Sequence, residues 1–476
     1  MLFRSHVASI FFDFEGRAFA FDREARFAGN TRAGAAVSLE LDAEAYHFSQ
    51  FDGLLNRPDV LLEIFGADPD LVATARDYRK RRNERLGFSL EEGAAAAPLP
   101  EIRIVGKAPL SVAASTVSLA LEATDSSSSI DRIQVHSNGV PVFGKEGYRI
   151  DTGSGAKWSG TVDVPLLRGA NDVRISVTNR SGLSSHETTL SIASEADGES
   201  VLYVAALGVS KYRDPGYDLN LSAKDALDLT AHFAANPGGL WSHVEILSLT
   251  DFEVTRESLP RVREFLSQAK PQDGAILFLA GHGLLDSNLE FRFATSEVDF
   301  KTERAGEGIR FTDLEDALFD CASLRKLLLM DTCHAGEIDE SRLQLLTSPR
   351  AGEWLAVKDR TRLEVPTPDF DRLVEGRNLI EHFFADLRRG SGATVLASSA
   401  GVEQSFEALP GMQNGVFTHF VLKCLREKAG DANRDGMIDL AELRSYVESE
   451  VAEVTNGHQK PSTRSFNLVN PFVIAR

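Results

Sequence analysis

The sequence predicts an α/β domain over residues 200–476, with a mostly parallel sheet that carries helices on both faces. A β-sandwich and a small β-rich and helical N-terminal region are expected before it. From residue 200 onward, short apolar segments alternate with amphipathic helical segments, as in a parallel sheet built from strand–helix units. Between residues 101 and 195 only strand-like segments occur, at the spacing of a β-sandwich. A chain of 476 residues is long enough for roughly two to four domains.

The N-terminal region, residues 1–90, divides into two patterns. Short alternating segments separated by turn signals predict a small β-meander over the first 50 residues. From Arg57 the periodicity becomes helical, with charge on one face. The basic cluster at 79–85 resembles a nucleic-acid patch, but a solvated helix face accounts for it better. A net charge of -19 also argues against nucleic-acid partners, whose phosphates are neutralised by Lys and Arg.

Residues 91–100, EEGAAAAPLP, are low in complexity and predict a linker. Residues 101–195 then predict an immunoglobulin-like (Ig-like) β-sandwich, which would lack a disulfide because this part contains no cysteine. Tight turns are expected at 137–139 and 179–182. We expect this domain to be a spacer or a docking module. Its strand-like segments lie at 117–124, 130–139, 141–145, 158–166, 171–179 and 188–193.

The elements expected in the α/β domain follow in strict alternation. Between its third and fourth helices, residues 338–376 are rich in charge and proline and longer than a simple connection, which predicts a flexible loop. Strands are expected at 202–209, 244–249, 275–280, 326–330 and 394–398, and helices at 223–235, 256–269, 312–319 and 378–388.

Two of the apolar segments end in residues that carry chemistry. In KLLLMDTCHAGE (326–337) the apolar run is followed by Cys333, and in AILFLAGHG (275–283) it is followed by His282, about 50 residues earlier. Carboxyl ends of parallel strands are where open α/β sheets bind ligands. A thiolate there attacks a carbonyl while a neighbouring imidazole accepts and returns its proton. The sequence therefore predicts a Cys–His dyad. The alternative is that both residues merely pack in tight turns.

The words GHG and DTCHAG resemble those of the metacaspase-like, prokaryotic branch of the caspase family. Residues 201–212, 221–229, 394–400, 403–405 and 415–418 continue the resemblance in colinear order over about 200–476. It implies a caspase-like fold with a mostly parallel six-stranded sheet, and cysteine endopeptidase activity with Cys333 and His282 as catalytic residues. It also implies an oxyanion hole made by the backbone N–H groups of Gly283 and Cys333. Nothing comparable covers the first 200 residues.

The resemblance further implies an acidic pocket for the residue before the cleaved bond. Asp331, two residues before Cys333, and Asp225 in the segment SAKDA correspond to the family's acidic positions. Two carboxylates in one pocket favour Arg or Lys through charge-assisted hydrogen bonds, so we expect cleavage after basic residues. Alternatively, Asp225 is an acidic residue in the first turn of a helix, where the helix dipole favours it.

DANRDGMIDLAE (431–442) meets the side-chain requirements of an EF-hand calcium loop, and helical segments at 416–428 and 440–453 flank it. It predicts Ca²⁺ binding, either structural or regulatory, while catalysis itself needs no cofactor. The alternative is a tight polar turn that keeps the shape without the ion. The expected ligands are Asp431, Asn433, Asp435, the backbone carbonyl of Met437, Asp439 and Glu442.

Partners and location follow from composition and from the resemblance. Three cysteines, no signal peptide and no long apolar run predict a cytoplasmic protein without membrane contact, acting on protein substrates. Caspase-like zymogens are activated by cuts after the nucleophile, so an upstream protease or a regulatory protein is expected as a partner. The loop 338–376 either is cut at its basic residues or recruits substrate. The resemblance suggests a bacterial stress or defence pathway. Two other functions stay open, a non-catalytic interaction module and a calcium sensor.

Overall fold

The computed structural model describes most of the chain, and its residues form two compact units, one mainly before Glu195 and the other mainly from Ala196 onward. No helix within the described ranges is long and apolar enough to cross a membrane. The described residues are 8–12, 18–29, 37–41, 44–86, 98–150, 155–236, 241–285, 291–300, 308–332, 356–357, 391–399, 405–464 and 472–476.

The first unit begins with an antiparallel sheet of β1 (Ala8–Phe12), β2 (Ala18–Asp22) and β3 (Phe27–Gly29) and a hairpin of β4 (Ser38–Leu41) and β5 (Glu44–His47). The short helix η1 (Phe48–Phe51) leads into α2 (Asp52–Leu55), α3 (Pro58–Ile64) and α4 (Pro69–Leu86). An aromatic core of Phe19, Phe27, Phe48 and Phe51 packs against Leu183 of the next segment. This part of the chain is therefore β-rich at its start and helical after it.

Two sheets with a common core follow. One sheet has the order β10-β9-β13-β14-β7, with β11 on β9, and the other has the order β12-β8-β6. Buried Val, Leu and Ile side chains from both sheets form one cluster. The Ig-like assignment stays a prediction. The bounds are β6 Glu101–Ile104, β7 Ser111–Val112, β8 Thr116–Thr124, β9 Ile130–Ser137, β10 Val140–Pro141, β11 Tyr148–Arg149, β12 Lys157–Pro165, β13 Gly169–Asn179 and β14 Thr188–Ser194.

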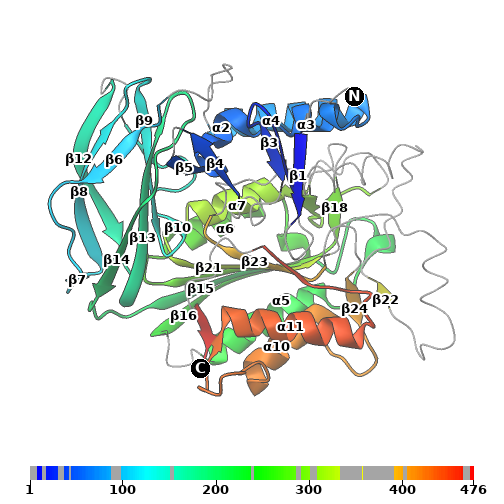
Figure 1. Ribbon diagram of the computed structural model, residues 1–476. Helices are drawn as coiled ribbons and strands as arrows, with labels where there is room; N and C mark the ends of the chain where they lie inside the picture. The colour runs from blue at the N-terminus through cyan, green and yellow to red at the C-terminus, as the bar shows by residue number, and fades with distance from the viewer. Residues whose placement is uncertain are drawn as a thin grey trace. The chain divides into compact units, whose positions relative to one another are not determined.

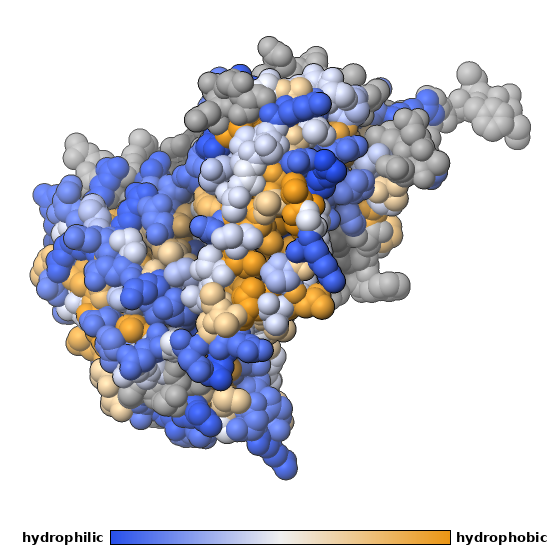
Figure 2. All heavy atoms as spheres, turned by 90° about the vertical axis from the view of Figure 1, so that its left-hand side faces the viewer, coloured by the Kyte–Doolittle hydropathy of each residue, from blue (hydrophilic) through white to orange (hydrophobic). Residues whose placement is uncertain are grey.

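The two predicted turns have the expected backbone. Asn138 (φ 53°) and Gly139 (φ 78°) both have positive φ, as a type I′ hairpin turn requires. Gly182 (φ 80°) donates its N–H to the carbonyl of Asn179 at 3.0 Å. The outer sides of these strands are polar, because β8 alternates exposed and buried residues. Figure 2 shows hydrophilic residues over much of the face that it draws and a band of hydrophobic residues near its centre.

The second unit is built on a six-stranded sheet of order β16-β15-β17-β21-β23-β26 (Figure 1). All neighbours pair in parallel except β23 and β26, which are antiparallel. The mostly parallel six-stranded sheet expected from the sequence is thus confirmed. Its strands are β15 (Val201–Gly208), β16 (His243–Thr250), β17 (Gly274–Gly281), β21 (Arg325–Thr332), β23 (Thr394–Ala397) and β26 (Ser462–Arg464).

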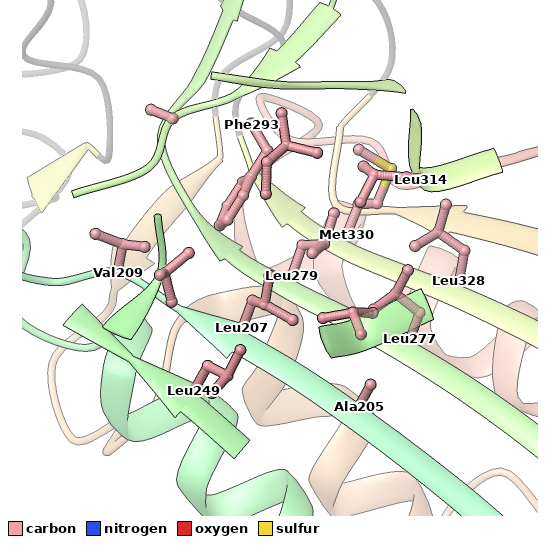
Figure 3. Close-up of a cluster of buried hydrophobic side chains, with 14 of the residues drawn as sticks. Ala205, Leu207, Val209, Leu249, Leu277, Leu279, Phe293, Leu314, Leu328 and Met330 are labelled. Carbon is pink, nitrogen blue, oxygen red and sulfur yellow. The ribbon is translucent and has the colours of Figure 1, made fainter. Parts of the chain in front are cut away.

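Helices cover both faces of this sheet, which explains the apolar runs of its central strands β15, β17 and β21. On one face, Leu207, Leu277 and Met330 pack with α6 (Ser258–Ser267) and α7 (Phe311–Phe319), and Figure 3 shows part of this cluster. On the other face, Val204 and Leu329 pack with α5 (Ser222–Ala235), α10 (Val416–Glu427) and α11 (Leu440–Val454). Figure 1 shows these two helical layers. The helix expected at 378–388 lies outside the described residues, as does nearly all of the loop 338–376.

A buried lysine near the start of β21 joins two other segments of this domain. Lys326 is 3% exposed, and its Nζ donates to the carbonyls of Leu318 (2.8 Å) and Ser391 (3.1 Å). Leu318 lies in the last turn of α7, where carbonyls lack helical partners, so the amine caps that helix. Burial lowers the pKa of Lys326 to about 8, although Cys321 and Asp320 oppose the shift.

This lysine makes the stability of the fold depend on pH in the alkaline range. Between about pH 8 and 10.5 the unfolded chain holds a proton on Lys326 that the folded chain has lost, so the contribution of Lys326 to the stability rises with pH across that window. The pKa difference corresponds to about 3 kcal/mol. We expect Lys326→Met to abolish this rise in urea unfolding measured from pH 7 to pH 11, whereas Lys107→Met, at an exposed lysine, leaves it intact. Identical pH slopes in wild type and Lys326→Met would contradict this assignment.

Candidate active site

The two catalytic candidates directly follow, in sequence, two neighbouring strands that end at one level. In the register of β17 and β21, Gly281 is the Cα partner of Thr332, and Ala280 is the partner of Asp331. His282 directly follows Gly281, and Cys333 directly follows Thr332. Cys333 itself lies outside the described residues. The sheet therefore brings the residues immediately before His282 and Cys333 side by side at its carboxyl edge.

His282 is held at three points and is only 1% exposed. Its backbone N–H donates to the hydroxyl of Tyr212 (3.0 Å), and its carbonyl accepts from the N–H of Ala294 (2.9 Å). Its ring Nε2 lies 2.9 Å from the carbonyl oxygen of Tyr217. A carbonyl oxygen can only accept, so Nε2 carries the proton and Nδ1 is the basic nitrogen of the neutral ring.

Aromatic rings enclose the imidazole on its other sides. The centroid of the His282 ring lies 5.0 Å from that of Tyr212 and 5.6 Å from that of Phe300. Phe300 in turn stacks on Tyr217 at 4.3 Å. These contacts fix the ring plane, so the position of Nδ1 is fixed with it.

Glycines flank His282 on both sides. Gly281 has φ 154°, and a Cβ there would lie 2.9 Å from the Tyr212 hydroxyl, so a side chain at this position would push the tyrosine away. Gly283 begins β18 (Gly283–Leu285) and pairs with Phe293. Its place directly after His282 is compatible with the predicted oxyanion hole, whose other donor, the N–H of Cys333, lies outside the described residues.

Both predicted pocket carboxylates are fully buried, and both contact the start of α10. Asp225 accepts from the side-chain amide of Asn414 (3.0 Å) and from the N–H of Gly415 (3.1 Å). Asp331 accepts from the hydroxyl of Thr418 (2.6 Å). The structure thus brings Asp225 and Asp331, about 100 residues apart in sequence, to one segment of five residues.

The two carboxylates differ in their surroundings. Asp225 also lies in the first turn of α5, as the alternative interpretation expects, but its oxygens bind the residues that begin α10. Asp331 lies at the strand end before Cys333, and the hydroxyls of Thr418 and Ser405 bind one oxygen each, the latter at 3.0 Å. Asp225 therefore ties two helices together, whereas Asp331 is held at the carboxyl edge of the sheet.

The predicted calcium loop makes a tight turn at Gly436. Gly436 has φ 79°, and its N–H and that of Asp435 donate to the two oxygens of Asp431. Ile438, in β25 (Ile438–Asp439), is fully buried and pairs with β27 (Val473–Ala475). The loop therefore has the turn and the short strand that EF-hand loops use.

The donor set of this loop also fits a hard cation. Glu442 reaches back across the loop, where its oxygens accept from the N–H groups of Ala432 (3.0 Å) and Asp439 (3.1 Å). Carboxylate, amide and carbonyl oxygens are what Ca²⁺ prefers. No group of three His, Cys, Asp or Glu side chains in the described part of the chain is arranged to hold a metal. In this arrangement oxygens of Asp431, Asp435 and Glu442 each accept a backbone N–H of the loop.

Several residues at the site have no counterpart in the sequence prediction. Tyr212 and Tyr217 contact His282 from the loop after β15, and Ser405 and Thr418 hold Asp331. Ser405 and Thr418 belong to segments that carry the family resemblance, and this resemblance could have pointed to them as site residues. Tyr212 also ends a segment of the resemblance, 201–212, and it lies four residues beyond β15, the strand that pairs with β17.

Comparison with known families identifies one match. A family model described as the caspase domain matches residues 204–473, more than half of the chain. The matched span contains Asp225, His282, Asp331, Cys333 and the loop 431–442. No curated protein matches the chain.

Similar solved structures include the fibronectin(III)-like modules of Clostridium thermocellum CbhA, with 13% identity and a TM-score of 0.15, over 21% of this chain and 47% of the modules. The SrpA adhesin of Streptococcus sanguinis matches with 17% identity and a TM-score of 0.17, over 30% of this chain and 79% of its own. A polysaccharide deacetylase from Bacillus cereus matches with 12% identity and a TM-score of 0.13, over 48% and 69%. The chain spans less than half of the CbhA modules, and TM-scores this low carry no argument.

Proposed function

Since the chain belongs to the caspase family of cysteine peptidases, we propose that it is an endopeptidase in which Cys333 is the nucleophile and His282 its acid–base partner. The observation that carries this proposal is the pairing of Gly281 with Thr332, since each precedes one member of the dyad. We propose that the protein acts in the cytoplasm on protein substrates, in a bacterial stress or defence pathway.

In this mechanism Nδ1 of His282 accepts the proton of the Cys333 thiol, and the thiolate attacks the carbonyl carbon of the scissile bond. The backbone N–H groups of Gly283 and Cys333 stabilise the oxyanion. His282 then returns the proton to the leaving amine, and a water molecule hydrolyses the thioester. The Tyr217 carbonyl supports the imidazolium form, because it accepts the hydrogen bond from Nε2 while the ring is charged.

Arg or Lys is the proposed residue before the cleaved bond. Asp331 is a buried carboxylate at the strand end that leads to Cys333, and Asp225 lies near the same end of α10. A hydrogen-bonded cation stabilises a buried carboxylate, and a guanidinium group can bind it in a bidentate manner. A substrate that ends in Asp would bring like charge into this pocket.

Turnover of fluorogenic peptides ending in Arg, Lys or Asp tests this function. We expect cleavage of the Arg and Lys peptides only, and none by Cys333→Ala. Preferential cleavage of the Asp peptide would overturn the proposed specificity. Turnover that persists in Cys333→Ala would overturn the nucleophile. An inactive chain that cannot be labelled at Cys333 would instead favour the non-catalytic interaction module.

We also propose that activity is released by proteolysis of the loop 338–376, by the protein itself or by an upstream protease. The basic residues of the loop, which suit the proposed specificity, include Arg342, Arg350, Lys358, Arg360 and Arg362. Full activity of purified protein whose loop is intact by mass spectrometry would rule out this activation step. A loop that only recruits substrate predicts that outcome.

Calcium is the proposed ligand of the loop 431–442, where it would stabilise the packing of α10 and α11 rather than take part in the chemistry. The residues that would hold it are Asp431, Asn433, Asp435, the Met437 carbonyl, Asp439 and Glu442. The support is the tight turn at Gly436 and the reach of Glu442 across the loop.

We expect Ca²⁺, but not Mg²⁺ at the same concentration, to raise the melting temperature of the full chain. A ligand at about 100 times its Kd adds about 2.7 kcal/mol to the unfolding free energy. Glu442→Gln removes one charged ligand oxygen and should abolish the shift, while Glu453→Gln, later on the same helix, should keep it. An equal shift in wild type and Glu442→Gln would exclude this loop, and a calcium-driven change of shape without any turnover would favour the calcium sensor.

A further inference from the structure

The phenol of Tyr212 contacts the backbone of His282. Its hydroxyl accepts the backbone N–H of His282 at 3.0 Å, and the side chain is only 2% exposed. The strand pairing of β17 with β21 ends at Gly281, so this N–H lies beyond the sheet's hydrogen-bond ladder. A buried N–H needs a partner, and the tyrosine supplies it.

The segment that carries Tyr212 is itself firmly held. The N–H of Tyr212 donates to the carboxylate of Asp218 (3.0 Å), and the N–H of Arg213 donates to the carbonyl of Ser296 (2.9 Å). Just before it, Ser210 donates its N–H to the carboxylate of Asp251 (2.8 Å). The hydroxyl of Tyr212 is therefore presented from a rigid loop rather than from a mobile one.

The same loop reaches His282 a second time. Tyr217, five residues after Tyr212, places its carbonyl 2.9 Å from Nε2 of the imidazole. Phe300 fills the space between the two tyrosines, with centroids 5.3 Å from Tyr212 and 4.3 Å from Tyr217. One loop thus binds both the backbone and the ring of His282, and the missing Cβ of Gly281 leaves the room that the hydroxyl occupies.

We propose that Tyr212 is a positioning residue for His282: its hydroxyl fixes the histidine backbone so that Nδ1 faces the Cys333 thiol. This inference rests on the proposed dyad. It assigns Tyr212 no contact with substrate. Because a displacement of about 1 Å at a reacting group can cost up to about a hundredfold in rate, loss of this one bond should be visible in catalysis.

The test uses Tyr212→Phe in the full chain, which keeps the ring between His282 and Phe300 and removes only the acceptor. The readout is the rate of Cys333 alkylation by iodoacetamide as a function of pH, because it reports the thiol–imidazole pair without needing turnover. We expect the rate near neutral pH to fall about tenfold and the lower limb of the pH profile to shift toward the ordinary thiol range. Tyr203→Phe, a remote tyrosine that packs on Phe265, should match wild type.

Repeating the substitution in a His282→Ala background separates positioning from general damage. Because Tyr212 acts only through His282, Tyr212→Phe should change the residual rate less than twofold there. An equal loss in both backgrounds would mean a merely structural role and would overturn the inference. The inference would also be overturned if Tyr212→Phe had the wild-type pH profile while His282→Ala was impaired. That result would leave the proposed dyad intact. If the wild-type protein and His282→Ala had the same pH profile, the proposed dyad would be overturned, and this inference with it.

Discussion

Replacing His282 by alanine is expected to lower kcat/KM for a basic peptide about 10²- to 10⁴-fold. Removal of a general acid–base group costs this much because the thiol must then ionise, and the leaving amine must be protonated, without help. The loss should appear mainly in kcat, since His282 contacts the reacting atoms rather than the side chain before the cleaved bond. Steady-state cleavage of an Arg peptide measures it directly.

Two controls make this result specific. His243→Ala changes an exposed histidine at the opposite end of the sheet, at the start of β16, and should leave kcat/KM unchanged. His282→Ala loses the ring contacts with Tyr212 and Phe300. Its melting temperature should therefore be measured to show that the variant is folded at the assay temperature. Activity within a factor of three of wild type in folded His282→Ala would remove His282 from the mechanism.

The second large effect is expected for Asp331→Asn. The substitution keeps an oxygen for the hydroxyl of Thr418 or Ser405 but removes the charge that would bind Arg or Lys. Leaving a buried cation without its partner costs about 3–5 kcal/mol, which corresponds to roughly 10²- to 10⁴-fold in kcat/KM. The loss should appear mainly in KM and only for peptides with Arg or Lys before the cleaved bond.

Asp273→Asn provides the matched control. Asp273 is equally buried at the amino end of β17, where it accepts from the N–H groups of Val201 and Lys270. An asparagine keeps one oxygen for one of these two bonds, and the site lies at the opposite end of β17 from His282, so the preference for basic peptides should not change. If Asp331→Asn cleaved Arg and neutral peptides with the wild-type ratio, the pocket would have to lie elsewhere.

Much of the fold is predictable from local patterns in this sequence. β15, β17 and β21 are buried on both faces, so each appears in the sequence as an unbroken apolar run, and the run ends where the chain leaves the sheet. That same break places His282 and the residue before Cys333 at one edge. A local pattern therefore indicated both the strands and the dyad that follows them.

The contacts that organise the site could not be predicted in this way, because they join residues far apart in sequence. The bonds from Asn414 and Gly415 to Asp225 span about 190 residues, and the bond from His282 to Tyr212 spans 70. Side chains such as Tyr212 have no periodic signal, since they lie in irregular segments. The turn of Asp225 toward α10, rather than only toward the α5 dipole, likewise depends on tertiary packing.

The most direct measurement of the central claim is mass spectrometry of the chain after reaction with an electrophilic peptide that ends in Arg. We expect a single thioether on Cys333, formed much more slowly in His282→Ala. Cys321 and Cys424 serve as internal controls, because both are buried, and burial raises the pKa of the Cys321 thiol and raises that of Cys424 to about 12. An unmodified Cys333, or a rate that is the same with and without His282, would contradict the account.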